Sequence, residues 1–296
     1  MDITSLSRLF TLAAIWGGSF LLMRIGAPVF GTGLLAELRV GIAALFLWGV
    51  CGWLGRRLHL RRHWRFYLVI GLLNSALPFL LFAYAAQTLS ASLMAILNSS
   101  SPIFGAIVAA VWLRRPVSRP AALGLALGFV GVATLAWDGV AMSGDGGWLA
   151  LAASLGAALS YSIASSYTKH VQASVGPTDV AHGSMWAAAL LVLPFALLIP
   201  APQVPAPADW MAAAALGVLC TGVAYLLYFR LIKDVGPVRA LSVTFLIPVF
   251  GVVLGVVFLG ETVGWKTLAG GVLVLLGTAL VNGVLGGGHA LKAEKR

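Results

Sequence analysis

Long apolar runs occupy most of this 296-residue chain and set the strongest limit on its fold. Ten such runs can be delimited, and a helix of about 20 apolar residues is long enough to cross the hydrocarbon core of a bilayer. The sequence therefore predicts an all-α membrane protein with ten transmembrane helices. The runs lie at approximately 8–25, 33–55, 66–86, 89–113, 119–137, 148–168, 180–200, 209–229, 237–259 and 264–285.

Composition excludes the main soluble alternatives. Hydrophobic residues make up 60% of the chain and charged residues only 9%, whereas a soluble domain carries about 25% charged residues. A soluble chain of this length could not bury so much apolar surface. The runs are continuous rather than alternating, which excludes a β-barrel. The net charge of +10 comes from cations in short loops between the runs, so no nucleic-acid partner is expected.

The basic residues are divided unequally between the two sides of the predicted bundle. If the N-terminus lies inside, sixteen of the nineteen Lys and Arg residues fall on the inner side, and only Arg24, Arg39 and Lys266 fall on the outer side. The positive-inside rule favours this orientation over its reverse. We therefore expect a multi-pass protein with both termini in the cytoplasm.

An internal repeat divides the chain into two halves. Residues 101–134 align without gaps with residues 247–280 at a constant offset of 146. The halves 1–143 and 144–296 would each hold five helices, and an odd number of helices inserts the second copy upside down. Inverted repeats place a binding site near the membrane midplane and allow alternating access, which favours a carrier, although channels can have such symmetry too. Identities in the alignment include Pro102/Pro248, Phe104/Phe250, Gly105/Gly251, Gly124/Gly270 and Gly131/Gly277.

Several motifs carry a resemblance to a known family. They are the small residues before Pro102 and Pro248, the Leu-Gly-Glu at 259–261, the paired glycines Gly124/Gly131 and Gly270/Gly277, the opening segment 14–20, and Arg39 in the second run. On these residues the chain resembles the EamA-type branch of the drug/metabolite transporter superfamily over nearly its whole length. Arg115 departs from the pattern, because the first half of such chains often has a glutamate where the second half has Glu261.

The resemblance implies a fold and a function. The implied fold is ten helices in two inverted five-helix repeats around a central cavity. Within the family, the chain is most similar to amino-acid and metabolite exporters, in particular to the aromatic amino-acid exporters of the YddG type. A bacterial inner (plasma) membrane is the location that this resemblance implies.

Polar and aromatic residues inside the runs are the candidate substrate-binding residues. An asparagine amide in an apolar run is costly to bury unless it finds a partner, and aromatic rings suit an apolar or aromatic ligand. Ordinary helix packing is the alternative for the serine and the aromatic residues. The candidates are Trp16, Phe20, Asn74, Phe79, Asn98, Tyr161, Ser165 and Tyr225. Prolines inside helices free backbone carbonyls, so Pro78, Pro102 and Pro248 are predicted hinges.

Charged residues are scarce inside the runs. Glu37 and Arg39 lie near the outer end of the second run. They are two residues apart and so do not face each other. We expect an outer ion pair that joins Glu37 to Arg24 at the end of the first run, with a gating or coupling role as the alternative. His182, near the start of the seventh run, could titrate, but we expect it to snorkel or to face a loop. Because membrane acids are so few, uncoupled exchange or facilitated export is favoured over proton coupling.

The first functional hypothesis is a secondary transporter that exports small metabolites, foremost aromatic or hydrophobic amino acids. The alternative is an exporter of drugs or lipophilic cations, while a membrane enzyme or an assembly subunit is less favoured. The sequence has no HExxH motif, no P-loop and no Cys/His metal spacing, so we expect no catalytic residue, no cofactor and no metal. The expected partners are a small-molecule substrate and the lipid bilayer, with the protein a monomer or weak oligomer.

Overall fold

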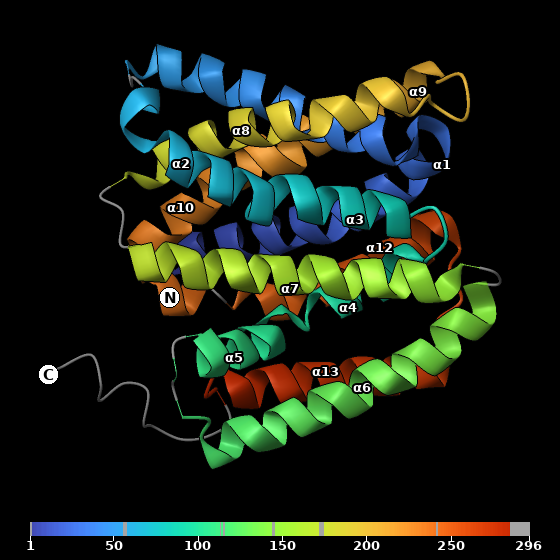
Figure 1. The fold of residues 1–296 in the computed structure, drawn as a ribbon. Coiled ribbons are helices and arrows are strands. Elements are labelled where there is room, and N and C mark those ends of the chain that lie inside the picture. Colours follow the sequence, from blue (N-terminus) through green and yellow to red (C-terminus); the bar gives the residue numbers. More distant parts are fainter. Residues whose placement is uncertain are drawn as a thin grey trace, which may run out of the picture.

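Apolar helices lie side by side in a bundle in the computed structural model (Figure 1). It describes residues 2–55, 58–112, 114, 116–143, 146–171, 175–240 and 242–284, and within these ranges every regular element is a helix. Seven of the described helical segments are long and apolar enough to cross a membrane, and α12 and α13 are shorter apolar helices. The elements are α1 (Ile3–Trp53), α2 (Leu60–Gly71), η1 (Leu72–Ala76), α3 (Leu77–Ala85), α4 (Ala91–Asn98), α5 (Ser101–Trp112), α6 (Arg119–Ser143), α7 (Gly147–Val171), α8 (Pro177–Leu198), α9 (Pro207–Gly217), η2 (Val218–Val223), α10 (Ala224–Val235), α11 (Pro237–Ala240), α12 (Val243–Leu259) and α13 (Trp265–Val281).

Helix α1 is not one straight rod. At Gly31 the backbone has φ 71° and ψ 177°, a conformation that glycine reaches without a steric penalty. The chain turns back there, because Nη1 of Arg39 lies 3.2 Å from Sδ of Met23, whereas a continuous helix would separate these residues by about 24 Å. Figure 1 shows the two parts of α1 on opposite sides of this turn. The predicted runs 8–25 and 33–55 fall in these two parts.

Two π-helical segments interrupt the bundle at related positions. Segment η1 begins at Leu72 and η2 at Val218, which is the same offset of 146 that relates the sequence repeat. A π-helix takes one extra residue into a turn and is frequent at functional sites. Both segments continue directly into helices, α3 and α10.

The three predicted hinge prolines lie in different local structures. Pro78 occupies the first turn of α3, directly after η1. Pro102 lies in the first turn of α5, after a break at residues 99–100 that separates α5 from α4. Pro248 lies inside α12, which continues past it. Whether any of them acts as a hinge stays a prediction.

Hydroxyl groups from other helices bind carbonyls at these interruptions. Ser160 of α7 donates to the carbonyl oxygen of Leu73 in η1 at 2.7 Å. Thr278 of α13 donates to the carbonyl oxygen of Ser99, in the break before α5, at 2.8 Å. Because no water is available in the lipid core to bind a freed carbonyl, these side chains supply the missing partner.

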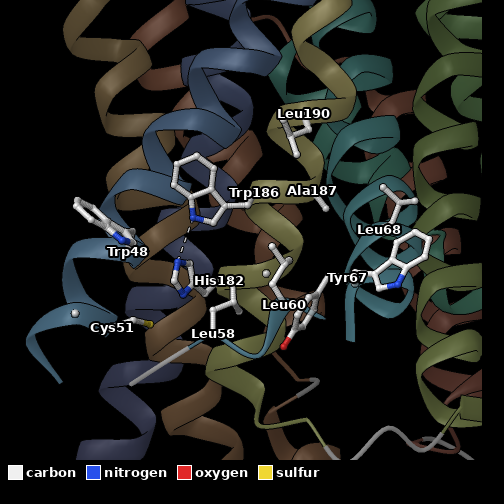
Figure 2. A pocket seen from close by; sticks show the side chains of 13 residues that line it. Trp48, Cys51, Leu58, Leu60, Tyr67, Leu68, His182, Trp186, Ala187 and Leu190 are labelled. Carbon is white, nitrogen blue, oxygen red and sulfur yellow. Dashed lines mark hydrogen bonds between the residues drawn. The ribbon is translucent and has the colours of Figure 1, made fainter. Parts of the chain in front are cut away.

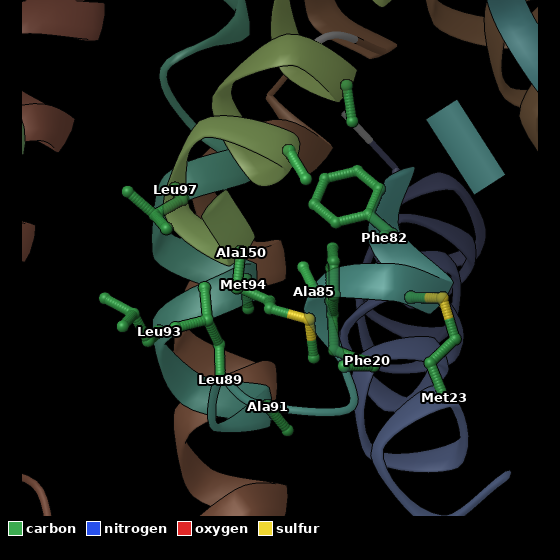
Figure 3. Packing of buried hydrophobic residues seen from close by; sticks show 14 of the residues in the cluster. Phe20, Met23, Phe82, Ala85, Leu89, Ala91, Leu93, Met94, Leu97 and Ala150 are labelled. Carbon is green, nitrogen blue, oxygen red and sulfur yellow. The ribbon is translucent and has the colours of Figure 1, made fainter. Parts of the chain in front are cut away.

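A buried apolar core surrounds the centre of the bundle. Figure 3 shows part of it, where residues of α1, α3, α4 and α7 meet. Phe20 of α1 and Phe82 of α3 pack edge to face with ring centroids 5.3 Å apart. This packing fixes the first part of α1 against α3.

Helices α6 and α13 approach each other through glycines. A Cβ atom added at Gly124 would lie 2.6 Å from the carbonyl oxygen of Gly277, and one added at Gly131 would lie 2.8 Å from that of Gly270. The contact therefore joins the glycines crosswise, 124 with 277 and 131 with 270, and the two backbones touch without side chains between them.

A side chain at this crossing should destabilise the protein. In Gly277→Ala the new Cβ would meet Gly124 O at 2.6 Å and Gly128 N at 2.8 Å, and overpacking of this kind costs about 1–3 kcal/mol. Gly105→Ala in α5 is the matched control, because a Cβ there meets nothing within 4 Å. Thermal unfolding in detergent micelles should show a lower Tm for Gly277→Ala alone, and equal Tm values for both variants would contradict the described crossing.

Candidate functional site

Arg39, in the second part of α1, is a cation buried in the interior. Its side chain is only 6% exposed. Nε donates a hydrogen bond to Oγ1 of Thr221 in η2 at 3.1 Å. The guanidinium carbon lies 3.8 Å from the centroid of the Phe79 ring in α3, within the range of a cation–π interaction. Arg39 thus joins α1, α3 and η2 at one point.

No carboxylate within the described ranges neutralises this charge. The salt bridges found there are Arg8–Asp234 at 2.5 Å and Arg230–Asp234 at 3.1 Å, both outside the buried interior. The remaining contact of the guanidinium is the Met23 sulfur, which is a weak acceptor. Arg39 is therefore a cation with a neutral surrounding.

The predicted outer ion pair is wrong. Arg24 donates through Nη1 to the carbonyl oxygens of Ala86 at 2.7 Å and Gln87 at 2.9 Å. Ala86 is the C-cap of α3, and terminal carbonyls of a helix lack partners within the helix and attract cations. Glu37 forms no salt bridge, and its Oε2 atom is buried without a hydrogen-bond partner. Arg24 is used to cap a helix, while Arg39 faces the interior.

A hydrogen bond joins η1 to α10, the helix that follows η2. Asn74 of η1 donates through Nδ2 to the Tyr225 hydroxyl of α10 at 2.8 Å. Thr221 of η2 donates its hydroxyl hydrogen to the carbonyl oxygen of Leu216, five residues earlier, at 2.9 Å. The same oxygen then accepts from Arg39. The Leu216 carbonyl thus accepts the Thr221 hydroxyl hydrogen. This bond orients the Thr221 hydroxyl oxygen toward the guanidinium of Arg39.

Aromatic rings lie beside part of the polar cluster, which consists of Arg39, Asn74, Thr221 and Tyr225. The ring of Phe79 covers the guanidinium of Arg39, and Tyr161 and Tyr225 pack against the apolar group that contains Phe79. Trp16 packs against Tyr228 with ring centroids 5.3 Å apart, in another apolar group. An apolar or aromatic ligand beside Arg39 would therefore meet the ring of Phe79.

The structure does not join every candidate to this cluster. Asn98 is the last residue of α4, and its Oδ1 atom is buried without a partner. Ser165 is exposed on α7. Phe20 is 4% exposed and belongs to the apolar core. None of these three makes a described contact with Arg39, whereas Phe79 contacts it directly.

Two important residues were missed by the sequence reasoning. Thr221 lies 146 positions after Ser75, so the repeat offset applied to η1 would have pointed to it. Glu261, named above only as part of the Leu-Gly-Glu motif, caps α4: its carboxylate accepts from Ala91 N at 2.6 Å, Ser92 N at 3.0 Å and Ser92 Oγ at 2.5 Å. A carboxylate is favourable at a helix N-terminus, but the partner helix lies 170 residues away and gives no local signal.

Two cavities lie away from the polar cluster. The larger, of about 750 Å³, lies where α1, α2 and α8 meet, and its lining includes Trp48, Tyr67, His182 and Trp186 (Figure 2). His182 accepts a hydrogen bond from Trp186 Nε1 at 3.1 Å and is 5% exposed. The expectation that it faces a loop is therefore wrong. The second cavity, of about 440 Å³, lies beside Arg24 and Glu261.

Comparisons with known proteins give a consistent result. A sequence model of the EamA-like transporter family matches residues 5–137 and again residues 148–283. The chain is 27% identical over 283 residues to the uncharacterized transporter YvbV of Bacillus subtilis, covering 92% of this chain and 89% of that protein. It is 25% identical over 269 residues to a probable terminal-alkyne amino-acid exporter of Streptantibioticus cattleyicolor, covering 90% and 89% respectively.

A solved structure supports the same fold. One crystal structure, of a protein whose description gives no function, matches with a TM-score of 0.66 and 20% sequence identity. The match covers 95% of this chain and 96% of the other. At this identity the similarity establishes the fold alone.

The hydrogen bond between Asn74 and Tyr225 should be measurable by a double-mutant cycle. Asn74→Ala and Tyr225→Phe each remove one partner, and the double variant removes both. We expect a coupling energy of about 0.5–1.5 kcal/mol in the free energy of unfolding, measured in detergent micelles. Additive effects, within about 0.3 kcal/mol, would mean that the two side chains do not interact.

Proposed function

Because the chain belongs to the EamA-like transporter family, and is thus a multi-pass membrane transporter rather than an enzyme, we propose that it exports small metabolites by alternating access. Amino acids with aromatic or hydrophobic side chains are the foremost substrates. The proposed location is a bacterial inner membrane with both termini in the cytoplasm, as the distribution of cations favours.

One observation carries this proposal: the polar cluster joins the two halves of the chain in the apolar interior. Asn74 and Arg39 come from the first half, while Tyr225 and Thr221 come from the second. Polar and charged groups are costly inside a membrane, and where they occur they usually mark a substrate pathway. A site at the boundary between two halves can be exposed to either side by their relative movement.

The proposed architecture is ten helices in two inverted repeats of five, residues 1–143 and 144–296. Three observations support it. The turn at Gly31 divides α1 into two parts. The glycines of α6 and α13 meet crosswise, as equivalent helices of opposite orientation would. The family model matches twice, on either side of the proposed boundary.

The substrate class has two sources of support. The relative from Streptantibioticus cattleyicolor carries an amino-acid exporter name, and Phe79, beside Arg39, belongs to an apolar group against which Tyr161 and Tyr225 pack. Trp16, Phe79, Tyr161 and Tyr225 are the proposed contacts for the substrate's apolar side chain. Asn98, Phe20 and Ser165 have weaker support, because none of them makes a described contact with Arg39.

A second candidate function is the export of lipophilic cations. The observation in its favour is the unpartnered Oε2 atom of Glu37, since a membrane carboxylate can bind a cation. The buried charge of Arg39 opposes it, because a second cation brought close to that guanidinium would be repelled.

Counterflow in proteoliposomes tests the proposal. Vesicles are loaded with one unlabelled amino acid at millimolar concentration, and uptake of the same labelled amino acid is followed without an ion gradient. We expect transient accumulation of aromatic or branched amino acids, strongly reduced in Asn74→Ala. Asn282→Ala is the matched control, since Asn282 is the exposed C-cap of α13. If lipophilic cations accumulate and no amino acid does, the substrate assignment is overturned.

A further inference from the structure

We propose that Arg39 is the group that binds the carboxylate of the transported substrate. This inference rests on the proposed function, because it names the chemical group by which the substrate is recognised. The substrates would carry a carboxylate next to an apolar or aromatic moiety, and the same molecules with the carboxylate blocked would bind poorly.

The argument begins with the cost of the charge. A cation buried away from water is strongly unfavourable unless an anion accompanies it. Arg39 is 94% buried, since its exposure is 6%. Proteins usually meet this cost with an acidic side chain nearby, and none forms a salt bridge with Arg39 within the described ranges. A ligand that brings its own negative charge would supply the missing partner.

Several described carboxylates are engaged elsewhere. Asp234 pairs with Arg8 and Arg230, and Glu261 caps α4. Glu37 is close in sequence, but residues two apart on a helix point in different directions, and its Oε1 atom lies on the side of Gly41. Within the part of the chain that the structure describes, no acidic side chain forms a salt bridge with Arg39.

The neighbouring side chains hold the guanidinium of Arg39 in place, but most of its N–H donors make no described hydrogen bond. An arginine has five N–H donors in a planar fork, and the described contacts use two of them, one on the hydroxyl of Thr221 and one on the Met23 sulfur. The ring of Phe79 covers one face. A planar fork of this kind matches a carboxylate, which can accept two parallel hydrogen bonds from it.

The surroundings also define the rest of the ligand. Phe79, Tyr161 and Tyr225 belong to or pack against one apolar group beside the cation. These rings suit an apolar side chain next to the carboxylate. Lipophilic amines without a carboxylate would bring a second positive charge to the site, and the site would reject them.

Ligand binding to the detergent-solubilised full chain tests the inference apart from transport. The probes are L-phenylalanine, its carboxamide, phenethylamine and 3-phenylpropanoate, with L-leucine and leucinamide as a second pair. We expect the carboxylates to raise the Tm and the amides and the amine to give little or no rise. Equal responses to a carboxylate and its amide, or no response to any carboxylate at millimolar concentration, would overturn the inference.

Variants of Arg39 separate recognition from structural support. Arg39→Gln should lose the carboxylate response, and Arg39→Lys, which keeps the charge but not the planar fork, should weaken binding by about 30-fold or more. The ligand-free Tm of Arg39→Gln should not fall, because removing a lone buried cation removes a desolvation cost. Arg230→Gln, at an exposed arginine, is the matched control and should bind as the unaltered protein does.

The outcomes distinguish this inference from the proposed function. Carboxylate binding that depends on Arg39, without counterflow of any probe, would overturn the transport proposal and leave the anion site standing. Counterflow that is undiminished in Arg39→Gln would overturn the carboxylate site at Arg39 and leave the transport proposal standing. A ligand-free Tm that falls by several degrees in Arg39→Gln, with the carboxylate still preferred over its amide in that variant, would assign Arg39 a structural role and overturn the inference.

Discussion

The lipid core offers no water to backbone or side-chain polar groups, and the arrangement of this protein follows from that constraint. Along most of the chain, helices satisfy this constraint, because their backbone amides and carbonyls bind each other. Where a helix is interrupted or ends inside the bundle, a side chain from another element completes the hydrogen bonding. Ser160 and Thr278 bind carbonyls at η1 and before α5, Arg24 binds the last carbonyls of α3, and Glu261 binds the first amides of α4. These bonds fix the packing of segments that are far apart in sequence.

Arg39 is the exception to this pattern, and the proposed recognition of a substrate carboxylate rests on it. Its contacts are a hydroxyl, a thioether and an aromatic face, none of which carries a full negative charge. These groups come from η2, from the first part of α1 and from α3, which follows η1, so the uncompensated charge lies close to both interruptions. A transporter needs a place that is unsatisfied without substrate and accessible from alternate sides, and this cluster meets the first requirement.

The sequence predicts the helical fold well and the site only in part. Hydropathy locates each apolar run along the chain, and the constant offset of 146 identified the glycines through which α6 and α13 touch. Neither hydropathy nor the repeat offset tells on which side of its helix a residue lies. Arg24 and Glu37 were paired because both lie near the same end, yet Arg24 turns to the carbonyls of α3. Ser165 was predicted to bind substrate, yet it is exposed on α7, whereas Ser160 of the same helix is buried. A π-helical turn rotates every later residue, so periodicity read through residues 72–76 or 218–223 cannot assign faces beyond them.

The extra residue has a consequence for how the chain can change over time. In an ordinary helix, the loss of one residue turns everything that follows by about 100°. In η1 the extra residue is confined to one turn, so its loss would restore an α-helical turn and leave Phe79 of α3 facing the guanidinium of Arg39. The same holds for η2 and Tyr225. These two short segments should therefore tolerate the loss of one residue far more readily than the helices on either side of them.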